Sequence, residues 1–235
     1  MHLRSVALFP EQYPTREHFP FNLEIFHRTT RVDFVTPITF FVGENGAGKS
    51  TLLQAIANRC GIHIWREVER KRFKRNPYEK KLPHYTAVEW CDGAVPGSFF
   101  GSDIFRTFAE SLDEWAANDP GLIEYFGGKS LVTQSHGQSL MSFFRSRYCI
   151  RGLYLLDEPE TALSPKTQLE LLALLGEMAG GGHAQFIIAT HSPILLSCPG
   201  ATILSFDHAP VKPIPYEESE HYRVYRDFFE RRGRT

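Results

Sequence analysis

Residues 43–51, Gly-Glu-Asn-Gly-Ala-Gly-Lys-Ser-Thr, match the phosphate-binding pattern G-x-x-x-x-G-K-[S/T] at every fixed position. The apolar run 38–42 before them predicts a strand, and the run 52–57 after them predicts a helix. A phosphate loop needs this order, because its backbone N–H groups and the helix N-terminus together attract an anion. We predict that the whole loop binds a nucleoside triphosphate: Gly43, Glu44, Asn45, Gly46, Ala47, Gly48, Lys49, Ser50 and Thr51.

Two side chains of this loop have predicted roles of their own. In loops of this pattern the lysine, here Lys49, reaches the β- and γ-phosphates, and the following hydroxyl, here Ser50, binds Mg²⁺. The alternative is a chance glycine-rich turn before a helix. Because both the spacing and the flanking elements fit, the sequence favours the nucleotide site.

The composition is that of an ordinary globular domain. The chain has 235 residues, of which 42% are hydrophobic, enough to bury a sizeable core. A formal net charge of −1 argues against a protein whose whole surface binds nucleic acid. The four cysteines are widely spaced and form no Cys-x-x-Cys pair, so the sequence predicts neither a zinc ribbon nor a disulfide framework.

The sequence does not predict direct insertion into a membrane. No apolar run approaches the roughly 18 residues of a membrane-spanning helix. The apolar run 6–9 is too short for the core of a signal peptide. We therefore expect a cytoplasmic protein that reaches a membrane only through a partner.

In the first two thirds of the chain, the sequence shows a clear secondary-structure pattern only in the residues before and around the phosphate loop. Residues 3–9 and 32–42 are expected to be strands that lead into it. Between about 61 and 133 the periodicity blurs, with a basic run, a Gly/Pro-rich patch at 93–101 and a helical pattern around 104–115. We interpret 61–133 as an inserted, partly helical lobe within one domain that covers residues 1–235.

From residue 152 onward strands and helices alternate. The apolar runs 153–156 and 186–189 predict buried strands. Between them Ser164 and Pro165 predict a helix start, and the glycines at 180–182 predict its end. Between these ends the apolar residues continue at helical spacing: Leu169, Leu172, Leu175 and Ala179. The pattern predicts an α/β P-loop fold with a mostly parallel central sheet, an antiparallel β flank and the inserted helical lobe.

Three polar sites follow predicted strands of this sheet: the loop, Asp157-Glu158 and His191. In open parallel sheets ligands bind at the carboxyl ends of the strands, so one nucleotide site can use all three. Asp157 would hold Mg²⁺, Glu158 would orient or deprotonate the attacking water, and His191 would donate a hydrogen bond to the γ-phosphate. The structural alternatives are a simple turn for Asp-Glu-Pro and a surface or core histidine, which the order and spacing of the sites disfavour.

Four stretches resemble motifs of the ATP-binding-cassette (ABC) superfamily, in the family's order. Residues 153–160, Leu-Tyr-Leu-Leu-Asp-Glu-Pro-Glu, resemble the Walker B strand with its glutamate, and residues 160–165, Glu-Thr-Ala-Leu-Ser-Pro, resemble the D-loop. Residues 190–193, Thr-His-Ser-Pro, resemble the switch-histidine motif. Residues 135–139, Ser-His-Gly-Gln-Ser, stand where the family places its Ser-Gly-Gly-Gln signature. Within the superfamily the chain resembles small standalone ATPases related to SMC and RecF proteins.

This resemblance implies ATP and Mg²⁺ as cofactors and a head-to-tail homodimer. In the family the signature caps the γ-phosphate bound to a second subunit, so Ser135, Gly137 and Gln138 would contact nucleotide in trans. ATP then holds two copies together and hydrolysis releases them. The function implied is an ATPase switch whose dimer acts on nucleic acid or on a partner protein.

The chain also departs from the family pattern. His136 replaces the first signature glycine, and the usual glutamine of the Q-loop is not identifiable, since only Gln54 and Gln134 lie between loop and signature. Asp103 is a weak substitute, and no aromatic residue can be assigned to stack on adenine. In transporters the Q-loop couples the nucleotide site to membrane subunits. The departure therefore disfavours the alternative function, an ATP-binding subunit of an ABC transporter.

Two further features remain open at this stage. Residues 66–81 carry a basic cluster with interleaved aromatic rings, which suits either nucleic-acid binding or a solvated surface. The aromatic residues between 222 and 229 predict a docking helix that more often packs into a core. A nucleotide-binding module with negligible turnover is a third hypothesis, which the intact Asp157-Glu158 pair disfavours.

Overall fold

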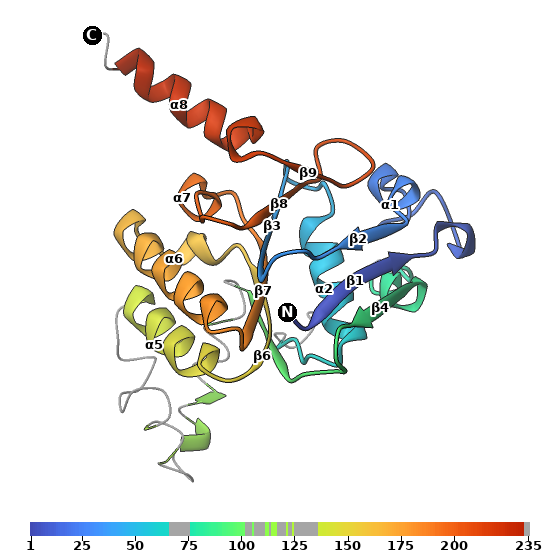
Figure 1. The fold of residues 1–235 in the computed structure, drawn as a ribbon. Coiled ribbons are helices and arrows are strands. Elements are labelled where there is room, and N and C mark those ends of the chain that lie inside the picture. Colours follow the sequence, from blue (N-terminus) through green and yellow to red (C-terminus); the bar gives the residue numbers. More distant parts are fainter. Residues whose placement is uncertain are drawn as a thin grey trace.

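Two β-sheets, with helices packed on them, form the body of the molecule (Figure 1). The computed structural model describes residues 1–65, 76–101 and 136–232, together with 105, 111, 112, 114–116, 121 and 124. Within these residues the chain is an α/β fold, as the sequence predicts.

The larger sheet is mostly parallel. Its strand order is β5-β6-β7-β3-β8-β9, and β9 alone runs antiparallel, to β8. All residues of β3 and β7 are buried, because this sheet is covered on both faces. The strands are β3 (Ile38–Val42), β5 (Gly97–Gly101), β6 (Gly152–Asp157), β7 (Ala184–Ala189), β8 (Thr202–Ser205) and β9 (Lys212–Ile214).

The smaller sheet is antiparallel, in the order β2-β1-β4. Its strands are β1 (Leu3–Leu8), β2 (Arg31–Asp33) and β4 (Thr86–Trp90). Gln185 on β7 joins the two sheets: its Oε1 accepts the N–H groups of His2 and Leu3, both at 2.7 Å, and its Nε2 donates to Leu3 O at 2.9 Å. The expected antiparallel flank is therefore this second sheet.

The prediction of one strand over 32–42 was wrong. The N–H of Phe34 donates to Arg4 O at 2.9 Å, in the small sheet, whereas Pro37 O accepts from the N–H of Phe186 at 2.7 Å, in the large sheet. The chain thus changes sheets between these residues. Pro37 itself has no N–H to donate, so it suits the start of a strand, and β3 begins immediately after it.

Helices on opposite faces of the large sheet create two hydrophobic cores. Phe186 and Ile188 of β7 pack in the core with α5 (His136–Tyr148) and α6 (Pro165–Gly180). Ile187 and Ala189 point the other way, into the core with α2 (Lys49–Arg59) and the small sheet. This alternation is the two-residue period of a strand buried on both sides. Short helices complete the fold: α1 (Glu24–Arg28), α7 (Pro193–Leu196) and the 3₁₀ turns at 10–12, 82–85, 159–162 and 216–218.

Helix α6 confirms its predicted ends and most of its apolar spacing. The Ser164 hydroxyl accepts the Thr167 N–H at 3.2 Å, Pro165 is the first helical residue, and the helix ends at Gly180. Of the four apolar residues noted at helical spacing, Leu175 and Ala179 are buried and Leu172 packs half-buried against the core. Leu169 is 56% exposed. Steps of three residues drift around a helix of 3.6 residues per turn, which carries Leu169 out of the buried stripe. It consists of Leu171, Leu174, Leu175 and Ala179.

The span expected to be an inserted lobe contributes directly to both sheets. Strand β4 pairs with β1, and β5 pairs in parallel with β6 from Gly97 opposite Leu153 to Gly101 opposite Asp157. This part of 61–133 is therefore part of the body. The helix expected around 104–115 and the basic residues 66–75 lie largely or wholly outside the described residues. The lobe and the single-domain organisation stay predictions.

The last helix, α8 (Glu220–Arg232), projects away from the sheets past α7, and the C-terminus lies at its far end (Figure 1). None of its residues is buried, and Phe228 and Phe229 are 55% and 63% exposed. The predicted helix is confirmed, but the interpretation that its aromatic residues pack into the core was wrong.

Candidate nucleotide-binding site

The glycine-rich loop lies between β3 and α2. Gly48 has a φ of +102°, and a Cβ at this position would lie 2.9 Å from the ring of Phe26. Gly46 has a φ of +83° but no atom within 4 Å of its Cβ position. Position 48 thus requires glycine for two reasons: the positive φ and the lack of space for a Cβ. Position 46 requires glycine for its positive φ alone.

Lys49 opens helix α2 and is 4% exposed. Its Nζ donates to the carbonyl oxygens of Gly43 at 2.6 Å and Glu44 at 3.0 Å, both in the loop. Burial lowers the pKa of the Lys49 ammonium, and the carboxylates of Glu158 and Asp157 act in the opposite sense. The ammonium is therefore held at the loop with acidic groups close to it.

Neighbouring strands bring the other predicted residues to the same edge of the sheet. Asp157 at the end of β6 is in register with Ala189 at the end of β7, and Ala189 is in register with Phe41 of β3. Across this edge the Ser50 hydroxyl donates to Asp157 Oδ1 at 2.7 Å. A hydroxyl and a carboxylate, both hard oxygen donors of the kind that Mg²⁺ prefers, thus lie side by side.

Glu158 has an unusual backbone. Its φ of 48° is the only left-handed value among the non-glycine residues that the structure describes. Such a conformation costs about 1–3 kcal/mol and persists only where the surroundings hold it. The Glu158 N–H donates to Ala189 O at 2.9 Å, and its Oε1 lies 3.7 Å from Nε2 of His191.

His191 is held on two sides. Its N–H donates to Glu160 Oε1 at 2.6 Å, and its Nδ1 lies 2.8 Å from Nε2 of His221. Its other ring nitrogen, Nε2, is buried without a hydrogen-bond partner. Burial, followed by the charges of Lys49 and His221, lowers the pKa of His191, so its ring is neutral at pH 7.

Sequence reasoning missed the two residues that hold His191. Glu160 was noted only as part of the D-loop resemblance, yet burial raises the pKa of its carboxyl and its Oε1 accepts the His191 N–H. His221 lies 30 residues beyond His191, in a helix without any motif. The aromatic pattern of residues 222–229 could have drawn attention to the helix, but not to this contact.

The signature residues lie at the start of α5, which packs on α6. The Cβ position of Gly137 is 3.9 Å from Thr167 of α6, and Gln138 is exposed. Ser135 lies outside the described residues, as does the side chain of His136. Neither Gly137 nor Gln138 lines the two cavities that flank the phosphate loop.

One of these cavities, of about 1010 Å³, opens beside residues 44–47. Phe206, Asp207 and His208, which follow β8, form another wall, and Asp207 Oδ1 accepts the Glu44 N–H at 3.0 Å. Charged residues near the start of α8, including Arg223, complete the cavity. The wall formed by residues 206–208 contains two aromatic rings, Phe206 and His208. Both follow the last recognised motif, so sequence reasoning did not assign either of them to stack on adenine.

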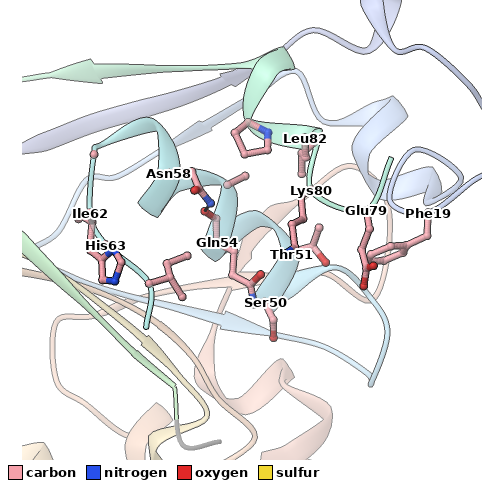
Figure 2. Close-up of a pocket in the computed structure, with 14 residues that line it drawn as sticks. Phe19, Ser50, Thr51, Gln54, Asn58, Ile62, His63, Glu79, Lys80 and Leu82 are labelled. Atoms are coloured by element: carbon pink, nitrogen blue, oxygen red, sulfur yellow. Dashed lines mark hydrogen bonds between the residues drawn. The ribbon is translucent and has the colours of Figure 1, made fainter. Parts of the chain in front are cut away.

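The other cavity, of about 580 Å³, runs along the outer face of α2. Figure 2 shows Ser50, Gln54 and Asn58 spaced along α2, and Glu79 and Lys80 also line the cavity. Gln54 therefore lines a cavity that reaches the loop, although it lies on the loop's own helix.

Comparison with known proteins identifies the family. A profile described as "AAA domain" matches residues 21–74, and one described as "AAA domain, putative AbiEii toxin, Type IV TA system" matches residues 139–197. The thiamine import ATP-binding protein ThiQ of Haemophilus influenzae is 28% identical over 167 residues, 65% of this chain and 74% of that protein. The protein of that name from Cereibacter sphaeroides is 30% identical over 167 residues, 65% of this chain and 69% of its own length. The chain belongs to the ABC-type P-loop ATPases.

Two solved structures share this fold. The SMC head domain from Thermotoga maritima has a TM-score of 0.51 at 16% identity, covering 92% of this chain and 99% of that one. The structure of cbiO1 from Clostridium perfringens, part of the ABC transporter complex cbiONQ, has a TM-score of 0.53 at 16% identity, covering 95% and 94%. Among the described residues of this ABC-type ATPase, no helix has the length and apolar character needed to cross a bilayer.

Proposed function

We propose that this ATPase hydrolyses ATP with Mg²⁺ at the edge formed by β3, β6 and β7, and that ATP brings two copies together. The observation that supports the site most directly is Nε2 of His191, a buried nitrogen that has no hydrogen-bond partner and lies 3.7 Å from Glu158. A buried polar atom without a partner is costly, and a phosphate oxygen would satisfy it.

The loop side of the site would bind the phosphates and the metal. Residues 43–51 offer backbone N–H groups and the Lys49 ammonium to the β- and γ-phosphates. Ser50 and Asp157, whose oxygens are 2.7 Å apart, would hold Mg²⁺, which when bound neutralises phosphate charge. The nucleoside would occupy the cavity beside residues 44–47.

The opposite side of the site would accept a proton from the attacking water and would detect the γ-phosphate. Glu158 orients a water toward the γ-phosphorus and accepts its proton as the new P–O bond forms and the bond to ADP breaks. His191 donates a hydrogen bond from Nε2 to a γ-phosphate oxygen. Both groups are neighbours in the structure, and the fixed backbone of Glu158 aims its side chain.

The dimer rests on the resemblance of residues 135–139 to the family signature. A 13-residue helix, α5, begins there, so its N-terminus offers N–H groups to an anion. In a head-to-tail pair Ser135, Gly137 and Gln138 would cap the nucleotide bound by the other copy. The cycle would then act as a cytoplasmic switch on nucleic acid or on a partner protein.

A transporter subunit is the second candidate function. The relatives named thiamine import ATP-binding proteins favour it. The missing Q-loop glutamine disfavours it, since Gln54 lies on α2 and Gln134 directly precedes the signature. Recovery of partners with an ATP-trapped variant separates the two candidates: a soluble protein or nucleic acid supports the switch, and a membrane permease supports the transporter subunit.

The Glu158→Gln variant tests the chemistry and the dimer together. It keeps the size of the side chain but removes the proton acceptor, so phosphate release should fall by about 10²–10⁴-fold while ATP still binds. With ATP-Mg the variant should migrate as a dimer in size-exclusion chromatography with light scattering. Glu170→Gln, on the exposed face of α6, is the matched control. A variant that stays monomeric at saturating ATP-Mg contradicts the proposed dimer.

A further inference from the structure

The base of α8 is fastened next to the nucleotide site. Tyr216, just before the helix, donates its hydroxyl proton to Pro193 O at 3.0 Å, two residues after His191. Ser219 is fully buried, and its hydroxyl donates to Tyr216 O at 2.7 Å and accepts the Tyr222 N–H at 3.3 Å. The first turn of α8 is thus fixed, and it places His221 against His191.

The hydrogen bond between the two histidines decides where His191 can carry its proton. A neutral imidazole has one N–H and one acceptor nitrogen. Phosphate oxygens facing the site only accept, so His191 must carry its proton on Nε2, which leaves Nδ1 as an acceptor. Among the residues that the structure describes, the group within hydrogen-bond distance of Nδ1 is Nε2 of His221, at 2.8 Å, which donates when it carries the proton of its own ring.

We propose that His221 is a positioning residue for His191: its Nε2–H donates to Nδ1 and fixes the tautomer that presents Nε2–H to the γ-phosphate. This inference rests on the proposed role of His191. The opposite tautomer would turn a lone pair toward the phosphate, so losing the His221 donor costs turnover rather than nucleotide affinity.

The same contact links the nucleotide site to the projecting helix. None of the residues of α8 is buried, and Glu220, Arg223 and Asp227 line the cavity beside the phosphate loop. When His191 engages a phosphate, the hydrogen bond to His221 holds the first turn of α8 more firmly. The helix therefore responds to the presence of the γ-phosphate, which is a coupling between two sites through one shared contact.

Paired substitutions at His221 test the positioning role. His221→Ala removes the donor, and phosphate release at saturating ATP-Mg should fall roughly tenfold to a hundredfold, with KM changed less than about threefold. His221→Gln can donate an amide N–H from a similar place, so it should recover most of the loss. His84→Ala, an exposed histidine in the 3₁₀ turn at 82–85, is the control. Equal loss in Ala and Gln variants overturns the proposal.

Amide hydrogen exchange of α8 tests the coupling separately. In Glu158→Gln, ATP-Mg should slow exchange in the first turns of α8 relative to ADP-Mg. The double variant Glu158→Gln/His221→Ala should still bind ATP but lose this difference. A difference that survives the double variant overturns the coupling.

The two proposals fail in distinguishable ways. If the unmodified chain releases no phosphate and Glu158→Gln binds no ATP, the proposed function fails, and the role of His221 fails with it. If the unmodified chain is active and His221→Ala retains its full turnover, only the role of His221 is overturned.

Discussion

The two halves of the nucleotide site are built in different ways. The loop half, with Lys49 and Ser50, is mostly local: consecutive residues supply the glycines, the ammonium and the helix N-terminus. Asp157 alone comes from elsewhere, at the end of β6, two strands away from β3 in the sheet. The histidine half depends on distant residues, since Glu160 and His221 reach His191 from 31 and 30 residues away. A local constellation can be recognised in a sequence, whereas one assembled across the fold cannot.

The loop half should show the largest single effect. Replacing Lys49 by alanine removes the ammonium that is hydrogen-bonded to the loop carbonyls, so phosphate release should fall by on the order of a hundredfold or more. Phosphate release and binding of a fluorescent ATP analogue measure this. Lys166→Ala, exposed in the first turn of α6, is the control. Unchanged turnover in Lys49→Ala would show that the loop does not bind phosphate.

The histidine half should lose stability when the Glu160 side chain, which accepts the backbone N–H of His191, is removed. Glu160→Ala leaves the N–H of His191 without its acceptor, which should lower the free energy of unfolding by about 1–3 kcal/mol. Glu160→Gln keeps an oxygen at the same place and should retain most of this stability. Urea unfolding measures the difference, with the exposed Glu177→Ala as the control. If Ala and Gln variants are equally stable, Glu160 does not anchor His191.

The buried rings of His191 and His221 should make the free energy of unfolding depend on pH, which is a smaller effect. Burial lowers the pKa of both His191 and His221 below the usual 6.5, so below pH 6.5 these two rings bind more protons in the unfolded chain than in the folded chain. The free energy of unfolding should therefore fall as the pH drops from 6.5 through the lowered values. Lys49 strengthens this effect, while Glu44, Glu158, Asp207 and Glu220 oppose it.

The measurement is urea unfolding of the unmodified chain and of the His191→Ala/His221→Ala variant across this range. The double variant should show a weaker dependence on pH. His84→Ala serves again as the control, because its ring is exposed. Identical pH profiles for the unmodified chain and the double variant would show that the two rings do not resist protonation.

The sequence predicts most of the fold wherever the pattern is strong and local. The strands that end at Asp157 and Ala189 contain the continuous apolar runs 153–156 and 186–189, and the Ser164 cap is a local hydrogen bond, so each could be predicted. The split of 32–42 into two strands could not, because it depends on which partner each backbone group meets. Strand β5 was hidden in a Gly/Pro-rich patch, where composition favours turns although the pairing with β6 holds a strand.

The candidate site shows the same difference between residues in local motifs, which could be predicted, and long-range contacts, which could not. Lys49, Ser50, Asp157, Glu158 and His191 were all predicted, and the structure brings them to one sheet edge. The contacts of Glu160 and His221 follow only from how α8 and the 3₁₀ turn after β6 pack around His191. The exposure of Phe228 and Phe229 was equally hidden, since an amphipathic pattern does not say whether anything covers its apolar face.

The position of β3 between β7 and β8 has a consequence for synthesis of the chain. The strand that carries the phosphate loop is made early, but both of its neighbours belong to the last quarter of the sequence. Pairing between such distant segments is slow, because the long intervening chain must first be ordered. While the ribosome is still adding residues 52–183, the loop has its complete motif but no sheet to hold it. ATP can therefore stabilise the finished domain, but it cannot guide the early steps by which that domain forms.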